Sequence, residues 1–361
     1  MGLLRFILAL SVVLYHSSSI FGFTLVGGQT AVQAFYIISG FYMALILNEK
    51  YIGINNSYKL FITNRLLRLY PVYWVVLLLT ILYSISVSIY SKGNDFAGFS
   101  LYVTYFDKMS LSSFLFLIFT NLSLFLQDTV MFLGLDVTKG NLFFTSNYKV
   151  TTPLLYQFLF IPQAWTIGIE LTFYLIAPFV VKKKLNFILL LFVLSVILRF
   201  VLYQCGLKND PWSYRFFPTE LAFFLLGVLS YHLYKKFYKV KIKVLYLKTI
   251  WGGVLGFTIF YGFLAFPRIN YVFLSVFFIC LPFIFILTKK WKNDRYLGEL
   301  SYPIYISHTF VLICLNELKM PVIGGLGLTL TLMTVLFSLL LNELVIKKIE
   351  SIRQKRVRLN S

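Results

Sequence analysis

Apolar stretches of about 20 residues recur from one end of this 361-residue chain to the other. A helix needs about 20 apolar residues to cross the hydrocarbon core of a bilayer, so the repetition predicts an all-α polytopic membrane protein. The composition agrees, because 59% of the residues are hydrophobic and only 13% are charged, about half the charged share of a soluble domain. We expect ten spans, at 3–22, 30–48, 70–91, 155–181, 185–204, 217–234, 249–266, 271–288, 299–318 and 322–346.

The net charge of +20 comes from Lys and Arg residues that lie in the gaps between apolar stretches. This distribution argues against a nucleic-acid partner and follows the positive-inside rule. It places both termini in the cytoplasm, with a membrane-embedded domain at 1–346 and a basic tail at 347–361. The segment 111–126 is then re-entrant or interfacial, because a crossing there would put the three lysines at 182–184 outside. Residues 92–154 form the large outer excursion.

Three ionisable side chains, those of His16, Glu170 and His308, lie well inside the expected spans. Each is eleven to thirteen residues from a cytoplasmic charge, or about 16–20 Å at the helical rise of 1.5 Å per residue. All three are therefore expected near the middle of the membrane. Burying such groups there is costly, so they mark a functional site by default.

His16 is the candidate general base, since a histidine buried at this depth is expected to be neutral and able to accept a hydroxyl proton. Glu170 is its candidate orienting partner, and the alternative is a structural acceptor. For His308, function and helix packing are equally supported. Two other classes stay open: His16 and His308 as axial ligands of a haem in an electron carrier, or buried charges lining the path of a lipid-glycan transporter.

Arg65 and Arg68 are three residues apart, so on a helix they share a face and can bind one anionic group. The alternative is that they anchor the topology. Pro71 is expected to open the next span, and the GGVLG spacing of Gly252 and Gly256 predicts helix packing. Arg199 and Glu220 are expected to pair. No metal site is predicted, because the three cysteines are far apart and show no metal-binding spacing.

Five motifs in order along the chain make it similar to the acyltransferase 3 family of bacterial integral-membrane acyltransferases. The motifs are RFILALSVVLYH with Arg5 and His16, FYIISGFYMAL at 35–45, RLLRLYP at 65–71, AWTIGIELTFY at 164–174 and YLGELSYPIYISH at 296–308. The departures are small: Tyr36 stands in place of a Phe and Thr166 in place of a Ser.

This resemblance implies a multi-pass enzyme of the bacterial inner membrane that transfers an acetyl or short acyl group. The donor is acetyl-CoA or a similar acyl-CoA, and the acceptor is a sugar hydroxyl of lipopolysaccharide O-antigen or of another polysaccharide or lipid-linked glycan. His16 is then essential, either as a base or as a transient acyl acceptor. The donor is expected to bind from the cytoplasm to three arginines, Arg5, Arg65 and Arg68. Four other motif residues are expected to contact the substrate: Ser39, Trp165, Tyr302 and Tyr305.

Overall fold

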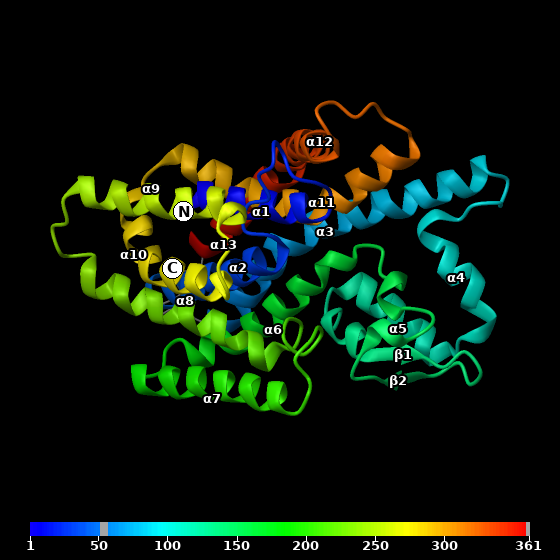
Figure 1. Cartoon of the computed structure of the whole chain (residues 1–361), viewed down its shortest axis with the longest axis horizontal. Helices are drawn as coiled ribbons and strands as arrows, with labels where there is room; N and C mark the ends of the chain where they lie inside the picture. The colour runs from blue at the N-terminus through cyan, green and yellow to red at the C-terminus, as the bar shows by residue number, and fades with distance from the viewer. Residues whose placement is uncertain (51–56, 359–361) are drawn as a thin grey trace. The chain divides into compact units, whose positions relative to one another are not determined.

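A computed structural model of the chain describes residues 1–50 and 57–358, and Figure 1 shows its helices. Seven of the described helices are long and apolar enough to cross a membrane, which confirms an all-α polytopic membrane protein. The count of ten spans and the side of each terminus stay predictions, and residues 359–361 of the expected tail lie outside the described residues. The helices are α1 (Gly2–Tyr15), α2 (Gly28–Glu49), α3 (Ser57–Tyr90), α4 (Ser100–Tyr105), α5 (Leu111–Ser123), α6 (Trp165–Val180), α7 (Leu185–Gln204), α8 (Phe217–Phe237), α9 (Val244–Phe260), α10 (Ile269–Thr288), α11 (Lys292–Glu317), α12 (Leu326–Leu341) and α13 (Lys347–Arg358).

The chain divides into two compact units. The first contains residues 1–68, 176–193 and 221–361, and the second contains 69–175 and 194–220. His16, His308 and the three predicted donor arginines belong to the first unit. Glu170 and Trp165 belong to the second.

Two expected helix boundaries are wrong. α1 has 14 residues, about 21 Å, and ends at Tyr15 because the Ser- and Gly-rich residues that follow leave the helix. α3 is one helix of 34 residues with Pro71 inside it, so Pro71 does not open a span. A membrane helix tolerates an internal proline when neighbouring groups satisfy the freed carbonyl. Arg65 and Arg68 therefore lie within a helix, as their spacing predicts.

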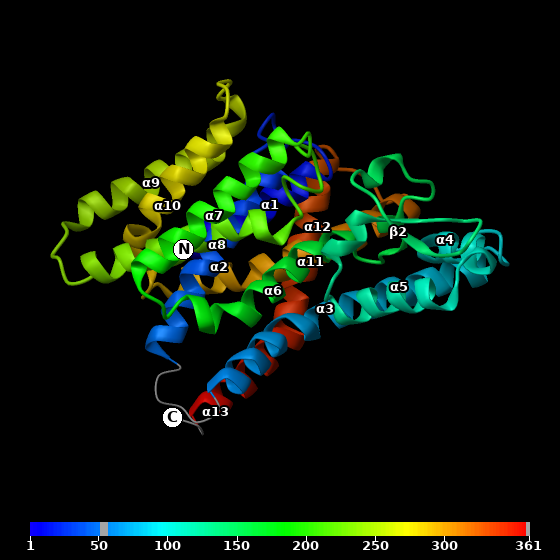
Figure 2. The ribbon, with the colours of Figure 1, turned by 90° about the horizontal axis from the view of Figure 1, so that it is seen from below.

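In the first unit, α1, α11 and α12 pack together around one apolar core (Figures 1 and 2). Ala9 and Val13 of α1 meet Leu300 and Ile304 of α11 and Leu330 of α12 in this cluster. Near the N-terminal ends of α1 and α11, a Cβ built on Gly298 would lie 2.9 Å from the Cα of Gly2. Two glycines thus allow the backbones of α1 and α11 to approach closely.

Asp294 of α11 caps the N-terminus of α1. Its carboxylate accepts hydrogen bonds from the backbone N–H groups of Gly2 at 2.7 Å and Leu3 at 2.9 Å, and from the Met1 ammonium at 2.7 Å. Burial alone would raise the pKa of this carboxyl, but these three donors outweigh burial and hold the pKa below its ordinary value. The first N–H groups of a helix have no partner within it, so this carboxylate fixes the start of α1 against α11.

We expect Asp294→Asn to lower the free energy of unfolding by about 1–3 kcal/mol, because buried N–H groups lose a charged acceptor. The folded-state pKa lies below the unfolded value of about 3.9, so the stabilisation is complete above that pH and is lost as pH falls through the folded pKa. Melting temperatures of the detergent-purified chain should therefore differ at pH 7 and converge in acid. Asn293→Ala, an exposed neighbour, is the matched control; equal melting of wild type and Asp294→Asn at pH 7 would contradict the cap.

Close glycine contacts lie between α2 and α8 and not where the GGVLG spacing predicts them. A Cβ on Gly40 would lie 1.9 Å from the carbonyl oxygen of Phe224, and a Cβ on Gly227 would lie 2.0 Å from that of Ile37. Among the described residues, no heavy atom lies within 4 Å of a Cβ built on Gly252 or Gly256. The packing prediction for GGVLG is therefore wrong, because small-residue spacing shows which helices can approach but not which ones do.

In the second unit, α5 is too short to cross a bilayer, which agrees with the expectation for 111–126. Three aromatic side chains of α3 donate to the last carbonyls of α5: Tyr70 to Ser123, Tyr73 to Asn121, and Trp74 Nε1 to Leu122 at 2.9 Å. The helix end is thereby satisfied.

Beyond α5 lies a short antiparallel hairpin, β1 (Leu133–Leu135) with β2 (Leu142–Phe144). It is joined by turns of 3-10 helix to the start of α6. Elsewhere in this unit the expected pairing of Arg199 with Glu220 is confirmed at 2.7 Å, with the carboxylate fully buried.

Candidate active site

The two histidines meet at the end of α1. Nε2 of His308 lies 3.3 Å from Nδ1 of His16, and the ring centroids are 5.0 Å apart. His308 is fully buried in the middle of α11, whereas His16 is the C-cap residue of α1 and is exposed. His16 therefore lies at a helix end and not inside a helix, while its depth in the membrane stays a prediction. An exposed ring held by a buried one is better placed to reach a substrate.

The hydrogen bonds assign the tautomers. Nδ1 of His308 lies 2.7 Å from the carbonyl oxygen of Tyr305, which can only accept, so this nitrogen carries the proton and Nε2 is an acceptor. Nδ1 of His16 lies 3.0 Å from the carbonyl oxygen of Val12 and also faces the His308 acceptor. It must therefore donate, and the lone pair of His16 resides on Nε2.

His16 caps the C-terminal end of α1, where its backbone N–H bonds to the carbonyl oxygens of Val12 and Val13 at 3.2 Å. The loop after His16 is held by α12, since Ser18 Oγ accepts from the Gly327 N–H at 2.9 Å. His16 is thus fixed from both sides, as a base needs to be.

The same distance argues against a haem between the histidines. Two axial nitrogens on one metal are about 4 Å apart, because each metal–nitrogen bond is about 2.0 Å. The ring nitrogens here are 3.3 Å apart and the rings are in contact. A macrocycle does not fit between rings in this arrangement.

A second cluster gathers arginines from three helices. Arg5 of α1, Arg68 of α3 and Arg295 of α11 all act electrostatically on the same two side chains, Tyr42 and Glu299. Three guanidinium groups within electrostatic range of the same two side chains suit a ligand with several phosphates. Sequence reasoning missed Arg295 because it lies in a basic border, where cations are expected as topology markers.

Arg65 has a different environment. Its side chain is buried, with the guanidinium carbon 5.9 Å from the Phe61 ring. Beside it, α13 docks on the first part of α3, where Arg353 donates to the Asn64 carbonyl at 2.9 Å and Arg356 to Thr63 Oγ1 at 2.8 Å. The described part of the basic tail is therefore a helix that packs on the segment before the arginine pair.

In the second unit, Glu170 is half-buried and accepts a hydrogen bond from the Tyr174 hydroxyl one turn later. Trp165 is buried, with the Arg215 guanidinium 4.2 Å from its ring centroid. A role for Glu170 beside His16, and for Trp165 in substrate binding, stays a prediction.

Asp128 is a further ionisable group in this unit. Burial raises its pKa to about 6, and a Cβ on Gly168 of α6 would lie 3.1 Å from its carboxylate. A buried carboxyl that titrates near neutral pH is a candidate functional group. The sequence offered no signal for it beyond one acid among several in the outer excursion.

The other predicted substrate residues lie in the first unit. Ser39 is buried on α2, Tyr302 is half-buried on α11, and the Tyr305 ring lies 6.1 Å from that of His308. The carbonyl group of Tyr305 connects this residue to the histidine pair.

The fold is that of a polytopic membrane protein, and the paired histidines are its candidate acid–base site. The model of the acyltransferase 3 family, described as an acyltransferase domain, matches residues 1–343. The chain belongs to this family and is a membrane acyltransferase. Comparisons with curated proteins and with solved structures found no match.

Proposed function

We propose that the enzyme transfers an acetyl or other short acyl group from acyl-CoA to a sugar hydroxyl of lipopolysaccharide O-antigen or another surface glycan at the bacterial inner membrane. The observation that carries this proposal is the His16–His308 pair. Its hydrogen bonds place the acceptor nitrogen, Nε2 of His16, on the exposed ring of the pair.

In the proposed reaction, the hydroxyl oxygen attacks the thioester carbonyl while Nε2 of His16 accepts its proton. The carbon–sulfur bond then breaks, an ester forms, and the CoA thiolate takes the proton back from His16. His308 holds His16 in the productive tautomer through its Nε2, a role that the sequence assigned to Glu170. Tyr305 positions His308 through its carbonyl oxygen.

The donor is proposed to bind through its phosphates to Arg5, Arg68 and Arg295, with Arg65 completing the group. This arrangement follows from the shared electrostatic neighbourhood of the first three residues. A helix rise of 1.5 Å per residue puts Arg5 about 16 Å from His16 along α1. An extended pantetheine arm covers such a distance.

The test is acetyl transfer in native membranes from acetyl-CoA labelled in its acetyl group to cell-surface glycan. We expect Arg68→Ala to raise the donor concentration for half-maximal rate by roughly 10- to 150-fold, as for a lost charged hydrogen bond of about 1.5–3 kcal/mol. The maximal rate should be nearly unchanged. Lys290→Ala, an exposed cation of the same unit, is the control. No transfer by the wild type would reject the proposed function, and an unchanged donor requirement in Arg68→Ala would remove that residue from the donor site.

A further inference from the structure

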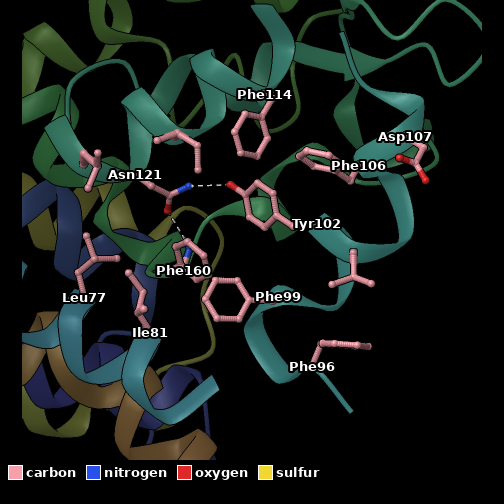
Figure 3. Close-up of a pocket in the computed structure, with 13 residues that line it drawn as sticks. Leu77, Ile81, Phe96, Phe99, Tyr102, Phe106, Asp107, Phe114, Asn121 and Phe160 are labelled. Carbon is pink, nitrogen blue, oxygen red and sulfur yellow. Dashed lines mark hydrogen bonds between the residues drawn. The ribbon is translucent and has the colours of Figure 1, made fainter. Parts of the chain in front are cut away.

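The second unit contains a cavity of about 650 Å³ at the far end of α3 (Figure 3). Its walls come from α3, α4, α5 and the segment before α6. Most of the side chains that face it are aliphatic or aromatic, as the close-up shows. The principal ones are Leu77, Ile81, Phe99, Phe114, Ile118 and Phe160.

Apart from the carboxylate of the exposed Asp107, the polar side-chain atoms in the wall bond to one another or to nearby backbone groups. The Tyr102 hydroxyl donates to the Phe158 carbonyl at 2.9 Å, and the Asn121 amide donates to that hydroxyl at 3.2 Å. The side-chain oxygen of Asn121, Oδ1, accepts a hydrogen bond from the Phe160 N–H at 2.9 Å (Figure 3). A polar ligand would have to break these bonds to gain its own, whereas a hydrocarbon leaves them intact.

Apart from the exposed Asp107, the mouth of the cavity is also apolar. Val103, Phe106 and Leu122 line the cavity and are themselves about half exposed. On α3 the neighbours of the lining residues, Leu78 and Leu82, are exposed as well. A water-filled site normally has a polar rim, so this one is built to be entered from a hydrocarbon phase.

We propose that this cavity binds the hydrocarbon chain of the lipid carrier to which the glycan acceptor is attached. The inference rests on the proposed function, which requires an acceptor, and it adds that the acceptor is recognised by its lipid as well as its sugar. A volume of 650 Å³ falls within the range of sites that bind small ligands or segments of larger ones. Bulk phospholipid is the competing occupant.

The kinetic test fills the cavity in the full chain reconstituted in nanodiscs. We expect Ile118→Trp and Ile81→Trp each to raise the KM for a lipid-linked glycan at least tenfold. The KM for acetyl-CoA should be unchanged, and so should the rate with a water-soluble oligosaccharide of the same sugar. Leu115→Trp, on the exposed face of α5, is the matched control. Equal KM values for lipid-linked glycan in all three variants and the wild type would overturn the proposal while leaving the transferase reaction standing.

A binding test identifies the occupant independently of catalysis. A photoreactive polyprenyl phosphate should label peptides between residues 96 and 122 in the wild type and Leu115→Trp, and label Ile118→Trp much less. Unlabelled polyprenyl phosphate should compete, and an equal excess of phosphatidylethanolamine should not. Equal competition by phosphatidylethanolamine would assign the cavity to bulk lipid and overturn the proposal.

Discussion

His16→Ala is expected to lower the rate of acyl transfer by about 10²- to 10⁴-fold, the usual contribution of a positioned general base. The donor concentration for half-maximal rate should change little, because the arginine cluster belongs to the other end of α1. Ser19→Ala, an exposed residue of the same loop, is the matched control. Initial rates in native membranes at matched expression measure the effect. A rate within threefold of the wild type would remove His16 from the chemistry.

His308 should act through His16, and a double-mutant comparison tests this. Without the His308 acceptor, His16 loses one of the two partners that hold its proton on Nδ1. His308→Ala should therefore slow transfer, and His308→Gln should recover part of the loss because its carbonyl oxygen can accept from His16. In the His16→Ala background, His308→Ala should cost little more, since residues that act as a unit are not additive. Additive losses would show that His308 has a role of its own.

The second large effect is expected at Gly40. Any side chain there meets the carbonyl oxygen of Phe224 at 1.9 Å, a backbone contact that cannot rotate away, so α2 and α8 would have to separate. We expect Gly40→Ala to lower the free energy of unfolding by about 3 kcal/mol or more. Thermal unfolding of the purified chain in detergent measures it.

Gly252→Ala is the control of opposite sign. The site is open, and replacing a helical glycine by alanine favours the helix by up to about 1 kcal/mol. Its melting temperature should be equal or higher. A Gly40→Ala protein as stable as Gly252→Ala would contradict the close approach of α2 and α8.

The Gly40 contact also gives a structural reason for the motif FYIISGFYMAL at 35–45, which the sequence identified only by its resemblance to the family. In FYIISGFYMAL the glycine lies where two helix backbones meet, and Tyr36, one turn earlier, stacks on Phe224 of the same partner helix at 4.5 Å. Similarly, Gly298 in the last motif lies where α11 meets Gly2 of α1. Parts of these motifs therefore hold helices together.

The sequence by itself determined the class of fold and the family. It also singled out His16 and His308, the two histidines that the structure brings together. The physical reason is that a bilayer requires long apolar segments and makes buried ionisable groups costly. Each of these constraints produces a local pattern that is visible in the sequence. The pairing of Arg199 with Glu220 was predictable on the same ground. Motif order then pointed to an acyltransferase.

Only the tertiary structure decided which groups meet. It placed His16 at a helix end, made His308 its partner, and added Arg295 to Arg5 and Arg68. It also showed that a close glycine contact lies at Gly40 and not at Gly252, where the sequence predicted one. These outcomes depend on where helices end and which faces they turn to each other, and such contacts join residues hundreds of positions apart, so no local pattern along the chain contains them.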